Sequence, residues 1–381
     1  MDVKDLKGIA VYVHIPFCDH KCIYCDFYSI ITRDNVSSFL NSLKREIENF
    51  GDKYSPGRII TSIFFGGGTP SLMKPEYIGD IIKSLKNNFI ISDSVEITME
   101  TNPGTVGKEK LKKFREAGIN RISIGVQSFD DKELKFLTRI HDSSTAIETI
   151  KYSSETGFDN ISLDLIFNLP YQNKEIWIRN LKTAITQPIK HLSAYSLILE
   201  RGTILNKKVL DGNITLQDDD HDADLYETTI DFLLDNGFYQ YEVSNFTKPG
   251  YECIHNNTYW QHKEYLGLGT SAHSFVDGKR WWNCSSLRRY ISEIDKKGEA
   301  IAGWEIISSR QLHNEYVMLA LRSSGIKLND YEEKFGNDWL NKNYSYFQKL
   351  KNENYIEFFE SGIRLTKRGY AVCDEILKNI L

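Results

Sequence analysis

The first apolar run of the chain, Ile9–Ile15, leads into the stretch His14-Ile-Pro-Phe-Cys18-Asp-His-Lys-Cys22-Ile-Tyr-Cys25-Asp-Phe27. The spacing Cys-x3-Cys-x2-Cys puts three soft thiolates on one short loop. Three thiolates suit three irons of a cubane cluster and leave the fourth iron open. A structural zinc site needs four closed ligands, which His14 or His20 could complete, but no second Cys/His pair with zinc spacing follows. The pattern favours an iron–sulfur cluster.

The first half of the chain repeats an apolar or β-branched strand, a loop and a charged amphipathic segment. Strands that alternate with helices predict right-handed crossovers and a parallel sheet. Six such units predict an α/β fold, an open partial (β/α)6 barrel related to the eight-fold one. The expected strands are Ile9–Ile15, Ile59–Phe65, Val95–Glu100, Arg121–Val126, Ile161–Ile166 and Leu192–Leu197. The expected helices lie near 35–50, 75–88, 107–117, 130–157 and 174–186.

Polar features follow the ends of these strands, where parallel α/β proteins place their ligands. The cysteine loop follows the first strand, and Gly66-Gly-Gly-Thr-Pro70 follows the second. Glu100 ends the third strand, Gln127 ends the fourth, and Asp164 lies near the end of the fifth. These features are expected to converge on one rim as a single site.

The repeating pattern weakens after about residue 200. An acidic helix start opens the segment 216–236, and a Gly- and aromatic-rich stretch follows from Phe238 to Trp282. From about 308 onward, helical patterns surround a hairpin-like segment at Tyr355–Leu365. We therefore expect two domains, residues 1–235 and a smaller, mainly helical domain of residues 236–381.

Charge and hydropathy narrow the expected partners and location. The 381 residues include 47 basic and 52 acidic side chains, a net charge of −5. That balance gives no general attraction to nucleic acid, so a winged-helix use of the C-terminal segment is not favoured. No apolar run approaches the ~18 residues that span a bilayer, and Ile9–Ile15 lacks a signal-peptide cleavage site. A cytoplasmic protein is expected.

The cysteine segment closely resembles the signature of the radical S-adenosylmethionine (SAM) superfamily. The resemblance implies a [4Fe–4S] cluster on Cys18, Cys22 and Cys25, with SAM chelating the fourth iron. The glycine-rich stretch resembles the motif that receives the SAM amino group, with Thr69 replacing an acidic residue, as in the HemN/HemW branch. Positions that match SAM contacts of that branch are Tyr12, Tyr24, Gly67, Gly68, Glu100, Gln127, Arg139 and Asp164.

Two functions compete within that branch. The dehydrogenase that oxidatively decarboxylates coproporphyrinogen III (HemN type) has a further cysteine two residues after the third ligand, where this chain has Phe27. The segment His255-Asn-Asn-Thr-Tyr259-Trp260 matches the His-Asn-x-x-Tyr-Trp motif of the HemW group. The match implies that His255 is an axial ligand of haem iron and that Tyr259 and Trp260 pack on the porphyrin. His273 is an alternative haem ligand.

The resemblance to the HemW group implies a haem chaperone that hands haem to an acceptor protein. A membrane-associated acceptor is compatible with this role, and an electron donor is required if SAM is cleaved. Whether the chain is also an enzyme stays open, and no catalytic residue is assigned. The dehydrogenase is the first alternative, and a haem-degrading radical SAM methyltransferase is the second.

Overall fold

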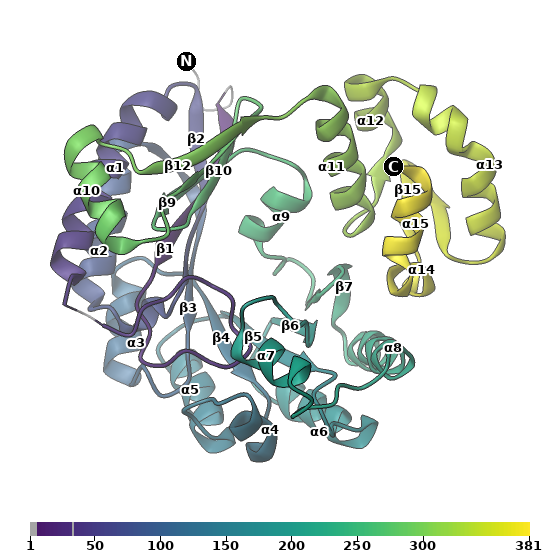
Figure 1. The fold of residues 1–381 in the computed structure, drawn as a ribbon, viewed down its shortest axis with the longest axis horizontal. Coiled ribbons are helices and arrows are strands. Elements are labelled where there is room, and N and C mark those ends of the chain that lie inside the picture. The colour runs from purple at the N-terminus through teal and green to yellow at the C-terminus, as the bar shows by residue number, and fades with distance from the viewer. Residues whose placement is uncertain (1–5, 33) are drawn as a thin grey trace.

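The computed structural model describes residues 6–32 and 34–381 and is built around a parallel sheet (Figure 1). Six neighbouring strands pair in parallel, in chain order, and curve into an open arc. The predicted partial (β/α)6 barrel is confirmed. The six strands are β1 (Lys7–Ile15), β2 (Arg58–Gly67), β3 (Ile90–Thr101), β4 (Arg121–Gln127), β5 (Asn160–Phe167) and β6 (His191–Ser196).

Helices cover the convex face of the arc (Figure 1). They are α1 (Val36–Tyr54), α2 (Pro75–Asn88), α3 (Lys108–Glu116), α4 (Asp131–Phe136), α5 (Ser143–Glu155) and α6 (Lys174–Ile185), with a short 3₁₀ turn, η2, at Pro70–Leu72. The single helical segment expected over 130–157 is two helices. Thr138 takes a left-handed backbone (φ 56°) that ends α4, and the Asp142 side chain caps α5 by accepting from Thr145 N–H. The loop between them carries Arg139.

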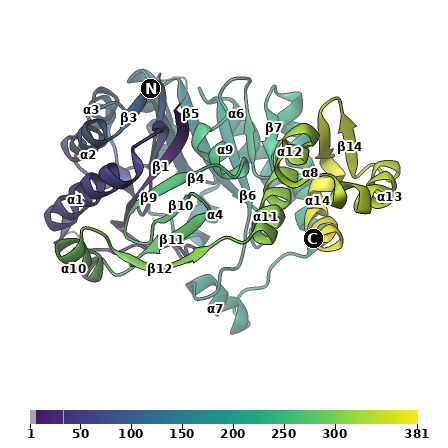
Figure 2. The same cartoon turned by 90° about the horizontal axis from the view of Figure 1, so that it is seen from above.

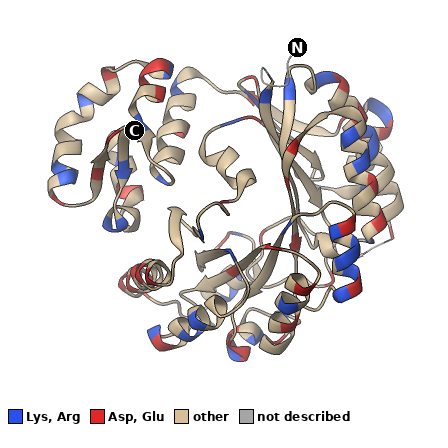
Figure 3. Cartoon of the chain, turned by 180° about the vertical axis from the view of Figure 1, so that it is seen from behind, with Lys and Arg blue, Asp and Glu red and all other residues tan. Residues whose placement is uncertain are grey.

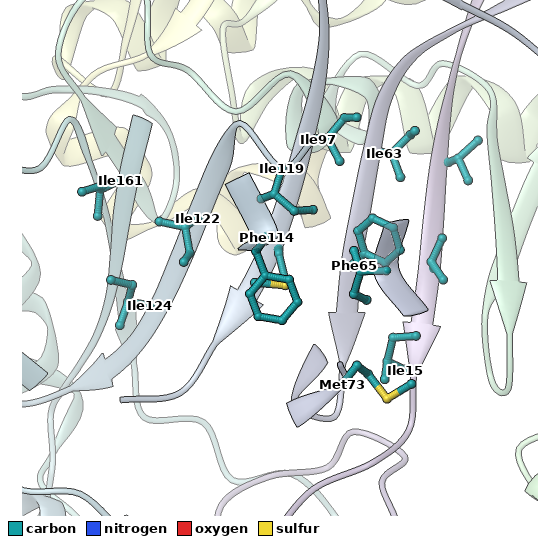
Figure 4. Packing of buried hydrophobic residues seen from close by; sticks show 14 of the residues in the cluster. Ile15, Ile63, Phe65, Met73, Ile97, Phe114, Ile119, Ile122, Ile124 and Ile161 are labelled. Carbon is teal, nitrogen blue, oxygen red and sulfur yellow. The ribbon is translucent and has the colours of Figure 1, made fainter. Parts of the chain in front are cut away.

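The pleat of the strands separates a dry core from the functional face. Alternate side chains such as Ile15, Phe65 and Ile124 point toward the helices and are fully buried (Figure 4). Each such side chain contributes roughly 1.5–3 kcal/mol through its burial. The intervening residues, Tyr12 and Glu100 among them, point to the concave face. The alternation that builds the core therefore also places the polar side chains on the inside of the arc.

Further strands extend the sheet at both edges. At the β1 edge, β9 (Tyr265–Gly269) pairs in parallel with β1 and is followed by antiparallel strands β10 (His273–Val276), β11 (Lys279–Asn283) and β12 (Ile301–Ile306). At the β6 edge lie β8 (Asn245–Thr247) and β7 (Tyr239–Glu242). The order is β12-β11-β10-β9-β1-β2-β3-β4-β5-β6-β8-β7. The helices of this part are α7 (Ile204–Leu210), α8 (Asp219–Asp235), α9 (Ile254–Trp260) and α10 (Leu287–Lys297).

A mainly helical module completes the chain and stands across the opening of the arc from the sheet, with α9 between them (Figures 1 and 2). Its buried cluster runs from Tyr316 to Ile380, whereas the larger cluster runs from Ile9 to Ala300. The two buried clusters meet in the chain between Ala300 and Tyr316. The sequence pattern predicts a domain boundary earlier, after residue 235. The module contains α11 (Ser309–Leu321), β13 (Ile326–Lys327), α12 (Leu328–Phe335), α13 (Asp338–Asn352), β14 (Ile356–Phe359), β15 (Gly362–Leu365), α14 (Lys367–Ala371) and α15 (Cys373–Ile380).

Basic and acidic side chains are mixed along the outer helices (Figure 3). Exposed ion pairs such as Arg45–Asp295, at 2.8 Å, link α1 to α10 and contribute about 0–1 kcal/mol each. In the described part of the chain, no helix has the length and apolar character needed to cross a membrane.

A buried carboxyl group joins the added strands to the barrel. Glu46 on α1 accepts hydrogen bonds from Gly269 N–H (2.8 Å), the Tyr290 hydroxyl (2.7 Å) and the Asn283 amide (2.6 Å). These partners come from β9, α10 and β11. Burial raises the pKa of Glu46 to about 7.

We predict that Glu46→Ala lowers the free energy of unfolding by about 3 kcal/mol, because three buried donors lose their acceptor. Chemical denaturation of the full chain measures this difference. Glu48→Ala on the exposed side of the same helix is the matched control and should change stability little. Equal effects of the two substitutions would contradict this role for Glu46.

Candidate functional site

The cysteine loop begins at the carboxyl end of β1. Cys18 N–H donates to Ile30 O (2.9 Å), which closes the loop, and Cys25 N–H donates to Cys22 O (3.2 Å) within it. All three thiols line one cavity of about 430 Å³ at the carboxyl ends of the strands. The structure therefore brings Cys18, Cys22 and Cys25 together at the predicted rim.

The glycine-rich loop after β2 packs directly against the cysteine loop. Gly68 N–H donates to Ile15 O and Thr69 N–H donates to Phe17 O, both at 2.8 Å. A Cβ on Gly68 would stand 2.7 Å from Phe17 O, closer than real Cβ contacts allow. Gly67 has a φ of 104°, and its missing Cβ leaves room for the His14 ring. Only glycine fits this approach of two backbones.

Hydrogen bonds link the first two cysteines through three further side chains. Cys18 Sγ and Thr69 Oγ1 share a hydrogen bond of 3.4 Å, and Asn102 Nδ2 donates to Thr69 Oγ1 at 2.9 Å. Arg139 Nη2 donates to Asn102 Oδ1 (2.6 Å), and its Nη1 donates to Cys22 Sγ (3.6 Å). Because Thr69 Oγ1 accepts from Asn102, its own proton is free to point at the sulfur. The sequence places Asn102 at the end of the third strand with Glu100, but sequence reasoning assigned it no role in the site.

Two half-buried carboxyl groups line the same cavity. Glu100 Oε2 accepts from Gly67 N–H (3.2 Å), and the Ser123 hydroxyl donates to Asp164 Oδ1 (3.2 Å). Burial, with a smaller contribution from Asp164, raises the pKa of Glu100 to about 8. Burial also raises the pKa of Asp164. A cationic ligand group in this cavity would lower both pKa values and hold both groups as carboxylates.

The other predicted SAM residues fall into two sets. Tyr24 and Gln127 line the cavity, and Tyr24 packs against an apolar cluster that includes Ile166. Tyr12 is not among the cavity-lining residues. Its ring lies near Glu100. Both side chains surround Gly66, where a Cβ would stand 3.0 Å from the Tyr12 ring and 3.1 Å from the Glu100 carboxyl group.

The donor set fits a cluster better than a single ion. Within residues 6–32 and 34–381, no group of three or more His, Cys, Asp or Glu side chains is arranged to hold one metal ion. A cubane cluster instead takes each thiolate on a different iron, and three thiols around one cavity suit that requirement. Burial raises the pKa of Cys25 to about 11 and that of Cys18 above its usual value, so binding of iron to these thiols would release their protons.

The predicted haem ligand His255 lies outside this cavity. Its side chain is 1% exposed, Ser62 Oγ and its Nδ1 share a hydrogen bond of 3.0 Å, and its Nε2 lies 2.9 Å from the Tyr259 hydroxyl. Burial lowers its pKa to about 3. Glu96 fixes the start of α9 by accepting from Ile254 N–H and His255 N–H. Both ring nitrogens are therefore engaged, and the imidazole is not presented to a ligand in this structure.

A second cavity of about 550 Å³ lies between the β9–β12 edge and helices α9 and α11. Tyr259 lines it, so the His-Asn-x-x-Tyr-Trp segment reaches a cavity through its tyrosine. Trp260 ends α9 half-buried and lines neither of the two cavities. His273, the alternative haem ligand, also lines the second cavity.

Comparisons with known proteins agree with this geometry. The Radical SAM superfamily model matches residues 12–184. The haem chaperone HemW of Bacillus subtilis is 34% identical over 96% of this chain and 97% of its own length. The chain belongs to the HemW family. A HemW from Lactococcus lactis is 31% identical over 98% of both chains. The mitochondrial radical S-adenosyl methionine domain-containing protein 1 of Danio rerio is 34% identical over 98% of this chain and 86% of its own length.

The HemW-family chain shares its fold with a solved radical SAM enzyme. Coproporphyrinogen III oxidase (HemN) from Escherichia coli superposes with a TM-score of 0.84 over 98% of this chain and 90% of that one, at 24% identity. The likeness covers both the arc and the C-terminal module, and it establishes the fold. A radical SAM domain implies a [4Fe–4S] cluster and SAM, and the cavity residues described above fit both groups.

We predict that Cys22→Ser abolishes the visible absorption of the reconstituted cluster and lowers bound iron severalfold, because one of three thiolate ligands is lost. Iron analysis after anaerobic reconstitution measures the change. Cys373→Ser, at a buried cysteine of α15, is the control and should retain full iron. A complete cluster in Cys22→Ser would refute the ligand assignment.

A second prediction concerns the glycine loop. Gly68→Ala should reduce both the cluster content and the affinity for SAM, because its Cβ would push the cysteine loop away from β2. Gly79→Ala on α2 meets only ordinary contacts and should leave both unchanged. Equilibrium binding of SAM to the reconstituted proteins compares the two, and equal affinities would contradict the close-packing argument.

Proposed function

We propose that this protein carries haem to an acceptor protein, with a [4Fe–4S] cluster on Cys18, Cys22 and Cys25 and SAM bound beside it. The observation that carries the proposal is the full-length likeness to curated haem chaperones, at 31–34% identity over 96–98% of the chain. That likeness includes the half of the chain that follows the radical SAM domain. The acceptor is an unidentified protein, and an electron donor is a further partner if SAM is cleaved.

The cavity supplies a complementary group for each part of SAM. Glu100 and Asp164 suit its ammonium and sulfonium charges, since both are half-buried carboxyl groups without a described cation at hydrogen-bond distance. Arg139 suits its carboxylate. Tyr24 and Ile166 offer an apolar surface to the adenine. When bound, the reduced cluster and SAM supply one-electron chemistry.

The remaining assigned residues hold these groups in place. The Gly67 and Gly68 backbone keeps the cysteine loop against β2, and Thr69 donates toward the Cys18 sulfur. Gln127 ends β4 with a φ of 70° and lines the cavity. Tyr12 lies near Glu100, and its hydroxyl is 3.2 Å from His14 Nδ1.

The shared fold with HemN favours coproporphyrinogen dehydrogenase activity, whereas the side chain of Phe27 opposes it. Phe27, where the dehydrogenase pattern has cysteine, lines the cavity and is 62% exposed. An apolar ring at this place offers no thiol for chemistry. The haem-degrading methyltransferase reading has no specific support among the described residues.

We predict that the reconstituted protein takes up haem and transfers it to an apo-acceptor, such as an apo-cytochrome, faster than free haem loads the same acceptor. Absorption of the acceptor's haem band measures the transfer. Serum albumin loaded with haem is a matched non-specific donor. Transfer no faster than from albumin would contradict the chaperone proposal.

The enzymatic alternative has its own test. Anaerobic incubation with coproporphyrinogen III, SAM and a low-potential reductant should leave the tetrapyrrole unchanged. Chromatography of the oxidised porphyrins measures the product. Accumulation of protoporphyrinogen IX over many turnovers would make the dehydrogenase the main function.

A further inference from the structure

The second cavity contains a histidine, His273, without a described hydrogen-bond partner, whereas both ring nitrogens of His255 are engaged. His273 is exposed at the start of β10 and lines the cavity. None of the described residues hydrogen-bonds to either of its ring nitrogens, whereas His262, in the same cavity, is bound to Glu315 Oε2 at 3.0 Å. An unengaged neutral imidazole in a cavity is the side chain that haem iron most readily takes as an axial ligand.

The walls of this cavity are suited to a flat apolar ligand. Its volume of about 550 Å³ lies within the ~300–1,000 Å³ range of small-molecule sites. One wall is the concave face of the added strands, and the other comes from helices α9 and α11 (Figure 1). The apolar and aromatic lining residues are Tyr259, Tyr265, Phe275, Trp282, Met318 and Leu319.

Gly303 on β12 leaves room for the Trp282 ring beside His273. The Trp282 ring stacks on the His273 ring, with centroids 5.9 Å apart and planes 27° apart. A Cβ on Gly303 of β12 would stand 2.5 Å from the Trp282 ring, so the ring can lie across that strand only because residue 303 is glycine. The Trp282 ring therefore lies against the imidazole that has no described hydrogen-bond partner.

One cation on the rim of the cavity, Lys263, suits a haem propionate. Lys263 is exposed, and within the described chain it has no carboxylate at ion-pair distance. Arg280 also lines the cavity, and its charge is balanced by Glu315 (2.5 Å) and Glu305 (3.1 Å). Arg280 balances one of these two negative charges and is held by both carboxylates, so among the described lining residues Lys263 is the cation available to an anionic ligand group.

The histidine of the His-Asn-x-x-Tyr-Trp segment affects this cavity indirectly, through Tyr259. His255 holds the Tyr259 hydroxyl at 2.9 Å, and the Tyr259 ring packs edge-on against Tyr265, with centroids 4.7 Å apart. Both tyrosines line the cavity. The motif histidine is therefore a positioning residue for the cavity wall.

We infer that this cavity is the haem site, with His273 as the axial ligand of the iron, Trp282 and Tyr259 against the porphyrin, and Lys263 at a propionate. The inference rests on the proposed carrier function and assigns the place of its cargo. The site adjoins the SAM side of the molecule, because β9 alone separates β10 from β1. Gly267 on β9 pairs with Tyr12, so His273 and Tyr12 lie about 10 Å apart across two strand spacings.

The test titrates haem into the full-length reconstituted protein and records its absorption and electron paramagnetic resonance spectra. His273→Ala should change the ligand-dependent spectrum of the bound haem and weaken binding at least about tenfold. Trp282→Leu should weaken binding while keeping the wild-type ligand spectrum. His255→Ala should also keep that spectrum, with weaker binding, because only the position of Tyr259 changes.

His221→Ala on α8 is the control, since its ring bonds Gln172 O far along the chain from the cavity, and it should bind like the wild type. Circular dichroism and iron content establish that each variant is folded. Wild-type haem spectrum and affinity in His273→Ala would overturn this site while leaving the carrier function standing. A wild-type protein that binds no haem would overturn the carrier function itself, and the site with it.

Discussion

The close approach of two backbones, the cysteine loop and the glycine loop after β2, is the constraint on which the rest of the site depends. Gly68 bonds Ile15 O where no side chain would fit, and this contact carries Thr69 to the Cys18 sulfur. Asn102 and Arg139 continue the hydrogen bonds to Cys22. The cysteines are thus held by strands that are far apart in sequence but adjacent in the sheet.

The alternation of side chains along the strands explains how one fold supplies both a stable core and a polar interior. Outward residues such as Ile15 and Phe65 pack against the helices, while the inward residues Glu100 and Asp164 are half-buried and have no described cation at ion-pair distance. Desolvation of these two groups disfavours their charged forms and raises both pKa values. A ligand with cationic groups relieves that cost, so the interior is preorganised for binding at some expense of stability.

The strand order, the cysteine site and most of the rim could be predicted, because each rests on local spacing or on the rule that parallel strands end at one edge. The break between α4 and α5 depends on Thr138 adopting a left-handed backbone, which the periodicity does not indicate. The joining of β9–β12 to the barrel depends on long-range pairing and on buried Glu46. The motif around His255 indicates its family but not that tertiary contacts with Ser62 and Tyr259 occupy its ring.

The site is proposed to hold a cluster with an open iron beside a SAM cavity lined by Glu100, Arg139 and Asp164. Electron paramagnetic resonance of the reduced, reconstituted protein, recorded with and without SAM, tests this arrangement most directly. We expect SAM to shift the cluster signal in the wild type, and Asp164→Asn to need a severalfold higher SAM concentration for the same shift. A cluster signal that SAM leaves unchanged at saturating concentration would contradict it.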